Sequence, residues 1–378
     1  MKRYKGIYFD HAATSYPKPK EVKAALLRAI TEEGGNPGRS THPLSLNAAY
    51  RLDAAREAIA SFFGMRDERG VVFTKNATEA LNLATAVFAK RGSHVLCDDM
   101  AHNALARPLY ALRDAGIIRL SFFSAHSKRE EIEKEIQRDT ALLCATHASN
   151  ICAFRADAAM LGALCRKHGL AFVLDASQSA GHMPVNITEI GADAVCIPAH
   201  KGLYGIMGAG AALFAAPRED LPSFLTGGSG SYSRSERMPS ALPEHFEAGT
   251  LPLPAIAAFE AGVRFVEKTG TAAIAYHTER LEKKLTEGLS VIKGIHLPVS
   301  ATGNGIISFT HENLSPSEVA ERLSLCGIAV RAGLHCAPLA HTTIGTEETG
   351  TVRISLGYTN TQAECDKFLR RIKSALQE

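Results

Sequence analysis

The chain has 378 residues, of which 46% are hydrophobic and 21% charged, and a formal net charge of +3. This length suffices for two or three domains with sizeable cores, and the composition is that of a globular protein. The small net charge, the absence of any apolar run of membrane-spanning length and an N-terminus without a signal-peptide pattern predict a cytoplasmic protein with no nucleic-acid or membrane partner.

The first part of the chain carries one strand pattern and two helix patterns. Residues 5–9 predict a short strand, and a helix is predicted over about 19–33, where a glycine-rich stretch ends it. Ser40 or Thr41 is expected to cap a second helix, in which apolar residues recur at helical spacing as far as Phe62.

From residue 71 short apolar runs alternate with helical segments. The runs are 71–74, 94–97, 117–123, 141–146, 171–174, 194–197 and 210–215, with helices expected after residue 76 and over 127–137 and 157–168. This alternation predicts an α/β fold with a mostly parallel central sheet and helices on both faces, in which ligands bind beyond the carboxyl ends of the strands. Five polar residues follow these runs and are therefore expected to meet at one site: Thr78, His102, Asn150, Asp175 and Lys201.

The last part of the chain predicts a second domain. Residues 226–250, rich in Gly, Ser and Pro, predict a long ordered loop of functional type. A long helical region is expected from about 255 to Gly294, followed by strands at 305–309, 328–331 and 350–356 and helices at 316–325 and 361–376. We predict a large cofactor-binding α/β domain over 16–262 and a smaller α+β domain made of 1–15 and 263–378.

The eight cysteines include no Cys-x-x-Cys pair, so no metal site is predicted and most thiols are expected to be free. Cys144 and Cys196 lie inside apolar runs and are expected in the core. Cys336 is different, because it lies in a segment between Gly333 and Pro338 that is expected to be flexible and has no apolar run to bury it.

Lys201 follows a buried apolar run and stands beside His200 among glycines. Lysine amines form Schiff bases with pyridoxal 5'-phosphate, which also needs an acid at its pyridine nitrogen, a phosphate cup and an aromatic ring against its face. Asp175 at a strand tip, the helix start over 76–78 and His102 meet these needs. Each alone has an ordinary explanation, such as a solvated lysine or a turn-capping aspartate; the combination predicts a pyridoxal-phosphate site.

Eight segments spread almost end to end carry a family likeness: 8–14, 38–42, 76–80, 175–178, 199–201, 246–250, 331–338 and 352–356. On these the chain resembles the cysteine desulfurases and selenocysteine lyases of the class V aminotransferase family, in the branch with a short catalytic-cysteine loop. The lysine, cysteine and Glu-Ala-Gly-Thr segments are specific in combination.

The resemblance implies a homodimeric fold-type I enzyme that uses pyridoxal 5'-phosphate to convert L-cysteine to L-alanine, with sulfur transferred as a persulfide on Cys336. Lys201 holds the cofactor and removes the substrate α-proton. The implied cofactor contacts are His102 stacking on the ring, Asp175 at its nitrogen, Gln178 at the phenolic oxygen, and Ala77, Thr78, His200 and the partner subunit's Thr250 at the phosphate. The implied substrate contacts are Arg353 and Asn150 at the carboxylate, with His42 and Arg331 facing the substrate.

The chain departs from the family pattern at three places. Pro198 stands where a hydroxyl or glycine is usual, which predicts that one phosphate contact is lost or replaced. His11 replaces Asn or Ser after Asp10, and Leu253 stands where a polar residue is common. These two departures bear on substrate preference.

Other functions stay open. One is a selenocysteine lyase that acts on L-selenocysteine; another is a β-lyase or aminotransferase with the same cofactor and no cysteine nucleophile. A catalytically silent relative is a third. A nicotinamide-dependent dehydrogenase would require Gly-x-Gly-x-x-Gly after an early strand, and the glycines at 205, 208 and 210 have another spacing. A sulfur-acceptor protein is a further partner that the sequence leaves unidentified.

Overall fold

The fold was examined in a computed structural model, which describes residues 5–37, 40–216, 221–300 and 303–377. Residues 1–4 of the predicted small domain, and Gly38 and Arg39 of the family-like segment 38–42, lie outside the described residues.

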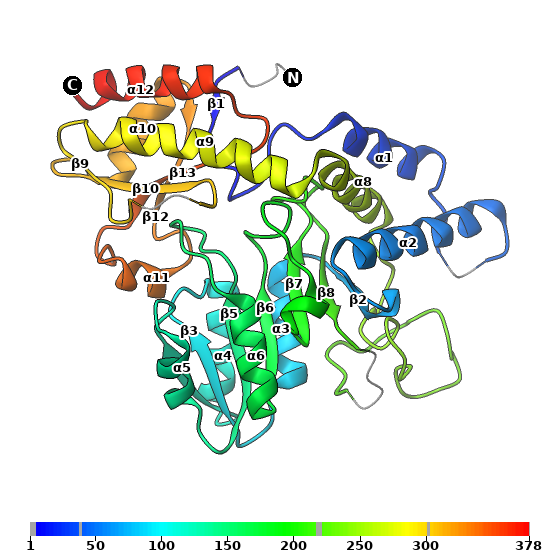
Figure 1. Cartoon of the computed structure of the whole chain (residues 1–378). Coiled ribbons are helices and arrows are strands. Elements are labelled where there is room, and N and C mark those ends of the chain that lie inside the picture. Colours follow the sequence, from blue (N-terminus) through cyan, green and yellow to red (C-terminus); the bar gives the residue numbers. More distant parts are fainter. Residues whose placement is uncertain (1–4, 38–39, 217–220, 301–302, 378) are drawn as a thin grey trace.

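The larger part of the molecule is built on a seven-stranded sheet with the order β2-β8-β7-β6-β5-β3-β4 (Figure 1). Its strands are β2 (Val71–Thr74), β3 (His94–Asp98), β4 (Arg119–Phe123), β5 (Thr140–Thr146), β6 (Ala171–Asp175), β7 (Ala194–Pro198) and β8 (Gly210–Phe214). Neighbouring strands are parallel from β4 to β7, whereas β8 runs antiparallel to both β7 and β2. The predicted mostly parallel sheet is confirmed.

Helices cover both faces of this sheet because successive strand residues point to opposite sides. Val72 packs in a core with α3 (Ala77–Phe88) and α4 (Asn103–Asp114). Phe73 packs in the opposite core with α2 (Pro43–Phe62), α6 (Ala158–His168) and α8 (Leu253–Thr269). The remaining elements here are α1 (Lys20–Thr31), α5 (Arg129–Glu135), the four-residue α7 (Ile187–Ile190) and a 3-10 turn at Glu68–Gly70.

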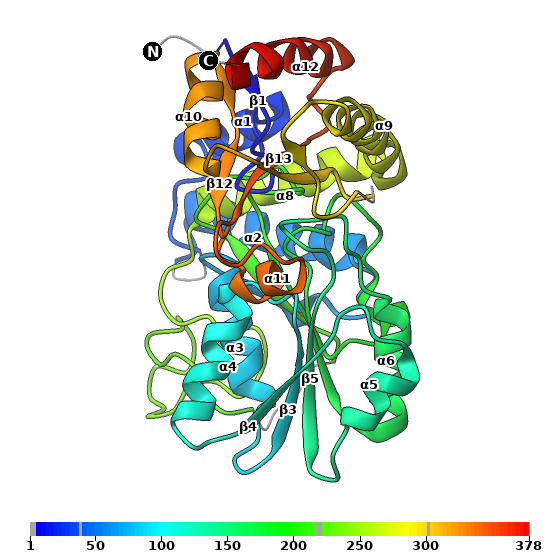
Figure 2. The same cartoon turned by 90° about the vertical axis from the view of Figure 1, so that its left-hand side faces the viewer.

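The smaller part holds a four-stranded sheet of order β12-β13-β10-β9 and a parallel pair β1-β11, with helices packed against them (Figure 2). The strands are β1 (Ile7–Tyr8), β9 (Ile295–His296), β10 (Ile306–His311), β11 (Ile328–Ala329), β12 (Arg331–Gly333) and β13 (Thr351–Ser355). The helices are α9 (Thr271–Ser290), α10 (Pro316–Leu325), α11 (Pro338–Thr343) and α12 (Gln362–Gln377). The N-terminal strand thus returns to the C-terminal part, as expected.

Several details differ from the sequence-based expectations. The cap of α2 is His42 rather than Ser40 or Thr41, because its Nδ1 accepts a hydrogen bond from the Ser45 amide at 3.3 Å. The helical region after residue 255 is broken at Gly270, whose φ of 86° ends α8 and begins α9. Helix α4 was not predicted; it holds Pro108 in its interior.

We propose the same two-domain division, with one adjustment. The boundary at 262/263 falls inside α8, so Gly270 is the more natural break between the two domains. No helix among the residues that the structure describes is long and apolar enough to cross a membrane.

Candidate active site

A cavity lies at the carboxyl ends of the parallel strands. Its lining comes from the segments that follow β2, β3, β5, β6 and β7: Asn76, Ala77, Thr78, His102, Ala104, Thr146, Ala148, Asn150, Asp175, Ser177, Gln178, Pro198, His200 and Lys201. The structure therefore brings together all five polar residues that follow the predicted strands. Asn76, the first residue of the helix start predicted to receive the phosphate, also belongs to the lining, as does Ser177, for which no contact was predicted.

Lys201 is held in a tight turn after β7. The Tyr204 amide donates to the Lys201 carbonyl at 3.0 Å, and Gly202 fits so closely that a Cβ atom there would lie 2.3 Å from the Ala180 carbonyl oxygen. Burial of the amine, together with the nearby Arg353 and Arg331 cations, lowers the pKa of Lys201 to about 8, although Asp175 opposes this. A substantial fraction of this amine is therefore neutral near physiological pH.

Asp175 and His102 each combine a local structural role with a place in the cavity wall. The Asp175 Oδ1 accepts a hydrogen bond from the Ser177 amide at 2.9 Å, so this buried carboxylate caps a turn, as its ordinary explanation predicts, and also lines the cavity. His102 caps α4 through its Nδ1, which accepts from the Ala104 amide at 3.0 Å. Burial and the Lys201 charge lower the pKa of His102 to about 4, so its ring is neutral.

The first turn of α3 presents polar groups at one end of the cavity. Asn76 caps this helix by accepting a hydrogen bond from the Glu79 amide at 2.9 Å, and Ala77 and Thr78 line the cavity behind it. Helix N-termini with a free first turn of amides favour phosphate. The Nδ1 of His200, also at the cavity, is buried and has no hydrogen-bond partner among the described residues.

These residues fit pyridoxal 5'-phosphate. A buried amine of lowered pKa, a strand-tip carboxylate, a neutral imidazole and an anion-favouring helix start share one cavity. Gln178 also lines it, and its Nε2 donates to the Ala12 carbonyl at 3.1 Å. Pro198 lines the cavity as well, and its effect on phosphate binding stays a prediction.

Arg353, on β13, is buried with only 1% of its side chain exposed. Its Nη2 forms an ion pair with Asp10 Oδ1 at 2.8 Å, and its Nη1 donates to the Asn150 carbonyl at 3.0 Å. The Asn150 amide donates to the His335 carbonyl at 2.8 Å, which leaves the buried Asn150 Oδ1 without a partner among the described residues. The sequence-based reasoning gave Asp10 no role in the site, although it lies in the family-like segment 8–14.

Cys336 is exposed, but the loop that carries it is anchored rather than free. The Asn103 amide, in the first turn of α4, donates to the Cys336 carbonyl at 2.7 Å, and the buried His335 contacts Thr351 Oγ1 through Nε2 at 3.2 Å. His335 and Cys336 have φ values of 48° and 58°, in the left-handed region that non-glycine residues seldom adopt. The loop expected to be flexible is thus a restrained turn, and Asn103 and His335 are parts of it that the sequence did not indicate.

The lysine, the arginines and the thiol share one electrostatic neighbourhood. Arg331 Nη2 lies 3.7 Å from Cys336 Sγ. The charges of Arg331, Arg353 and Cys336 all act on Lys201. The C-terminal part of the chain therefore supplies Cys336 and both arginines, which lie close enough to Lys201 for their charges to act on it but do not belong to the cavity lining.

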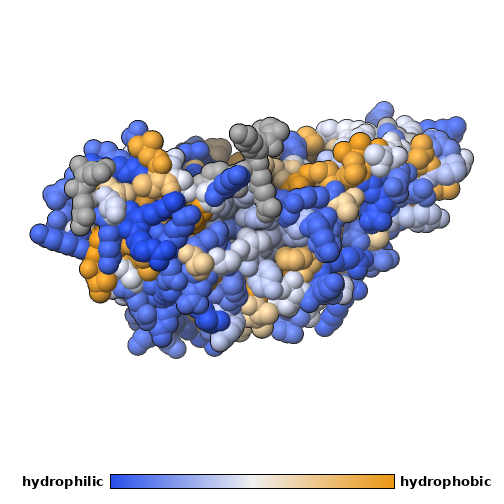
Figure 3. All heavy atoms as spheres, turned by 90° about the horizontal axis from the view of Figure 1, so that it is seen from above, coloured by the Kyte–Doolittle hydropathy of each residue, from blue (hydrophilic) through white to orange (hydrophobic). Residues whose placement is uncertain are grey.

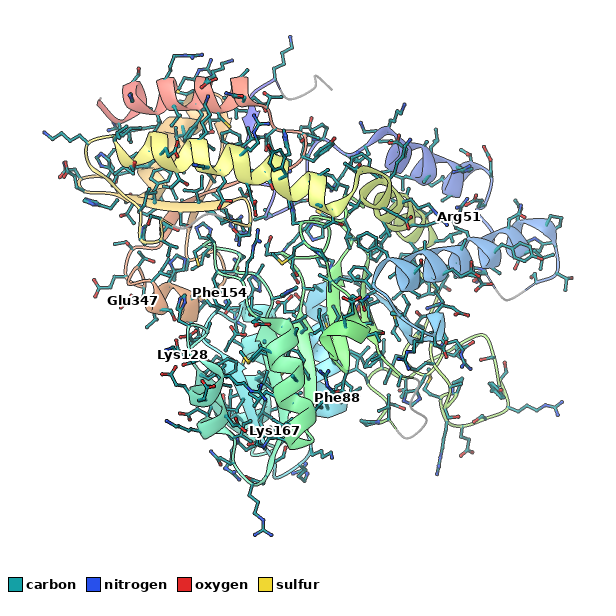
Figure 4. The ribbon with its side chains drawn as sticks, viewed as in Figure 1. Arg51, Phe88, Lys128, Phe154, Lys167 and Glu347 are labelled. Atoms are coloured by element: carbon teal, nitrogen blue, oxygen red, sulfur yellow. The ribbon has the colours of Figure 1, made fainter. Side chains whose placement is uncertain are left out.

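Two predicted site residues, His42 and Thr250, lie elsewhere in the single chain. His42 is exposed at the start of α2, a helix that Arg51 fastens by bonds to Glu33 and Glu260 (Figure 4). Thr250 is exposed and lines a separate cavity with residues of α2 and of the 226–250 segment. Neither belongs to the lining of the cavity around Lys201.

The proteins to which this chain is similar agree with a pyridoxal-phosphate site. The family model for aminotransferase class-V matches residues 7–368. A probable cysteine desulfurase of Methanothermobacter thermautotrophicus is 32% identical over 368 residues, covering 95% of this chain and 92% of that protein. One of Pyrococcus abyssi is 30% identical, covering 96% and 92%. The apo structure of cysteine desulfurase from Thermococcus onnurineus NA1 superposes with a TM-score of 0.89 at 30% identity, covering 99% of this chain and 95% of that one.

Proposed function

We propose that this chain, which belongs to the aminotransferase class-V family, is a pyridoxal-phosphate-dependent cysteine desulfurase that converts L-cysteine to L-alanine and transfers the sulfur to Cys336. The observation that carries the sulfur-transfer step is the exposed Cys336 thiol on a restrained loop, close enough to Lys201 for their charges to interact. A reactive cysteine must be accessible, and the other cysteines are buried apart from the partly exposed Cys326.

The cofactor, when bound, supplies an electron sink for the negative charge that develops at the substrate α-carbon. Lys201 is the residue proposed to hold it, with Asp175 at the ring nitrogen and His102 on the ring face. Gln178 is proposed for the phenolic oxygen. The phosphate is assigned to the start of α3 at Ala77 and Thr78 and to His200, and this assignment is supported by their places around the cavity.

Lys201 is also the proposed base for the α-proton. Its pKa of about 8 leaves an appreciable share of the amine neutral, which is the form that accepts a proton. Cys336 Sγ then takes the sulfur from the substrate: its new S–S bond forms as the substrate C–S bond breaks. The product is a persulfide on Cys336, available to a sulfur-acceptor protein, and the remaining carbon skeleton leaves as L-alanine.

Arg353 is the proposed carboxylate-binding residue, because a guanidinium matches a carboxylate in shape and charge. Its Nε is buried and has no hydrogen-bond partner among the described residues, so a donor is available. The Asn150 amide, by contrast, is engaged by the His335 carbonyl, so a contact from Asn150 to the substrate requires that bond to open. Arg331, beside Cys336, faces the same region.

A homodimer is proposed to complete the site, with His42 and Thr250 acting on the partner's cavity. The α1–α2 end of the molecule carries exposed aliphatic side chains, seen as orange spheres in Figure 3, and one exposed tyrosine beside them. The aliphatic residues are Leu27, Ile30, Leu44 and Leu46, and the tyrosine is Tyr50. Exposed apolar patches of this kind mark interaction surfaces. Sedimentation velocity tests the assembly, and Tyr50→Lys is expected to shift it toward the monomer. All eight cysteines are unpaired, which supports the proposed cytoplasmic location.

The test of the function is alanine release from L-cysteine by the wild type and by Cys336→Ala, with Cys326→Ala as the control. We expect release to depend on Cys336 and not on Cys326. Equal rates in wild type and Cys336→Ala would remove Cys336 from the reaction. L-Selenocysteine and cystine are assayed in parallel: activity on selenocysteine alone would identify a selenocysteine lyase, and cystine cleavage without Cys336 a different lyase.

A further inference from the structure

Arg353 pairs with Asp10 and keeps one buried donor without a hydrogen-bond partner among the described residues. Its guanidinium has five N–H groups in a rigid plane. Asp10 Oδ1 and the Asn150 carbonyl occupy one Nη group each, at 2.8 and 3.0 Å. The Nε, buried like the rest of the side chain, has no hydrogen-bond partner among the described residues. An incoming carboxylate would therefore meet a guanidinium that already carries one carboxylate.

The backbone around Asp10 is held to β13 by hydrogen bonds. The Ser355 amide donates to the Phe9 carbonyl at 2.8 Å, the His11 amide to the Ser355 carbonyl at 3.3 Å, and the Ala12 amide to Ser355 Oγ at 2.9 Å. These bonds join the segment around Asp10 to β13 two residues beyond Arg353. The backbone of Asp10 therefore stays beside Arg353 when a second anion reaches the guanidinium.

The charges around Arg353 affect how strongly it binds a second carboxylate. Arg353 is buried beside a second cation, Arg331, and Asp10 is the carboxylate with which it forms its ion pair. A substrate carboxylate on the Nε edge would lie within several ångströms of Asp10, where two like charges repel appreciably in a partly buried site. Asp10 thus opposes substrate binding by its charge while its oxygen holds the guanidinium in place.

We propose that Asp10 is a positioning residue that sets the affinity of the site for the substrate carboxylate. It holds Arg353 with the Nε edge free for that carboxylate, and its negative charge keeps the bound amino acid from being held too tightly. The proposal rests on the proposed function only in taking Arg353 as the carboxylate-binding residue.

Two substitutions at Asp10 separate the effect of its charge from the effect of its acceptor oxygen. Asp10→Asn keeps an acceptor oxygen near Nη2 and removes the charge, so the dissociation constant for an L-amino acid is expected to fall roughly tenfold. Asp10→Ala removes both charge and acceptor and leaves Nη2 without its partner. Arg353 then loses its fixed orientation, and the dissociation constant is expected to rise. A merely structural role for Asp10 would move both variants in the same direction.

The experiment measures binding of L-alanine to the cofactor-loaded protein through the visible absorbance of the cofactor. L-Alanine carries the carboxylate and lacks sulfur, so the measurement does not involve Cys336. Ethylamine, an amine without a carboxylate or a thiol, is titrated in parallel and is expected to bind the wild type and Asp10→Asn equally. Asp139→Asn is the matched control, because it removes the charge of another Asp–Arg pair, with Arg119 at 2.7 Å, on the exposed surface.

Tighter alanine binding by Asp10→Asn, with ethylamine binding unchanged, would support the proposal. Unchanged or weaker alanine binding by that variant, or a parallel change in ethylamine binding, would overturn it. If Asp10→Asn does not fold, Asp10→Glu replaces it: this variant keeps the charge, so tighter alanine binding by it would also overturn the proposal and unchanged or weaker binding would support it. Failure of the wild type to release alanine from cysteine would instead refute the proposed function and leave these binding results standing.

Discussion

Lys201 and Cys336 are the two reactive groups proposed for one reaction, yet the protein holds them in opposite ways. Lys201 is buried at the end of β7, and burial lowers the pKa of its amine to about 8. Cys336 is exposed, and its loop is restrained by hydrogen bonds from Asn103 and His335. Burial thus lowers the pKa of the proposed base, whereas backbone restraint positions the proposed sulfur acceptor and leaves it open to solvent.

The largest expected effect comes from removing the buried amine. Lys201→Ala should lower alanine release from cysteine by at least about a thousandfold, because both the cofactor attachment and the base are lost. The visible absorbance of lysine-bound cofactor should disappear as well. Lys167→Ala is the control, since Lys167 lies on the surface of α6 and pairs with Glu133 (Figure 4). A rate near that of wild type in Lys201→Ala would refute the assignment.

The second effect concerns the restraint on the thiol. His335→Ala removes the contact with Thr351 and should lower alanine release roughly 10- to 100-fold, because small displacements of reacting groups are costly. The cofactor absorbance should stay unchanged, which distinguishes this variant from Lys201→Ala. His296→Ala, at an exposed position on β9, serves as the control. A change in the cofactor absorbance parallel to the change in rate would contradict a role of His335 in the Cys336 loop alone.

The third prediction concerns pH, because the protein buries several histidines in the neutral form. Burial lowers the pKa of six histidines to values from about 2 to about 4: His11, His102, His147, His182, His200 and His335. The unfolded chain protonates these rings below about pH 6.5, whereas the folded protein does not. Stability is therefore lost as the pH falls through 6.5, and these groups have no effect above that value.

Asp98 and Glu282 act in the opposite direction, because burial raises the pKa of each to about 7. Six histidines outweigh two carboxyls, so we expect the free energy of unfolding to fall by roughly a few kcal/mol between pH 7.5 and pH 5.5. The thermal midpoint of the purified protein over this range is the measurement. A constant midpoint would show that the histidines are not kept neutral by burial.

The smallest effect tests a single amide. Asn103→Pro removes the N–H that donates to the Cys336 carbonyl, and proline is well tolerated in the first position of a helix. His102 already has a ψ of 152°, which suits a residue before proline. Alanine release should fall by about threefold, in line with one lost hydrogen bond. Arg129→Pro, the same change at the start of α5, should leave the rate of alanine release unaltered. Equal losses in both variants would show that the Asn103 amide has no specific role in the reaction.

Sequence reasoning located the features that depend on local pattern. Lys201, Asp175 and the start of α3 follow apolar strands directly, and the parallel order of those strands places their ends at one edge. The alternation of strands and helices was sufficient to predict that these residues meet at one edge of the sheet.

Contacts between residues far apart in the sequence could not be predicted from local patterns. The Asp10–Arg353 pair joins residues 343 positions apart, and no local pattern connects them. Helix α4 was missed because Pro108 interrupts an otherwise regular pattern, and the break at Gly270 was missed because one glycine is a weak signal. The restraint on Cys336 depends on left-handed backbone conformations at His335 and Cys336, which are unusual for those residue types.

The bond between Asp10 and Arg353 also sets an order of events during synthesis. A ribosome completes Asp10 near the beginning and Arg353 near the end, so a nascent chain can form the seven-stranded sheet, whose last strand ends at Phe214, long before Arg353, the proposed carboxylate-binding residue, is made. Fragments released early would hold the proposed cofactor-binding residues of that sheet without Arg353. The proposed site is therefore completed last, when translation is almost finished.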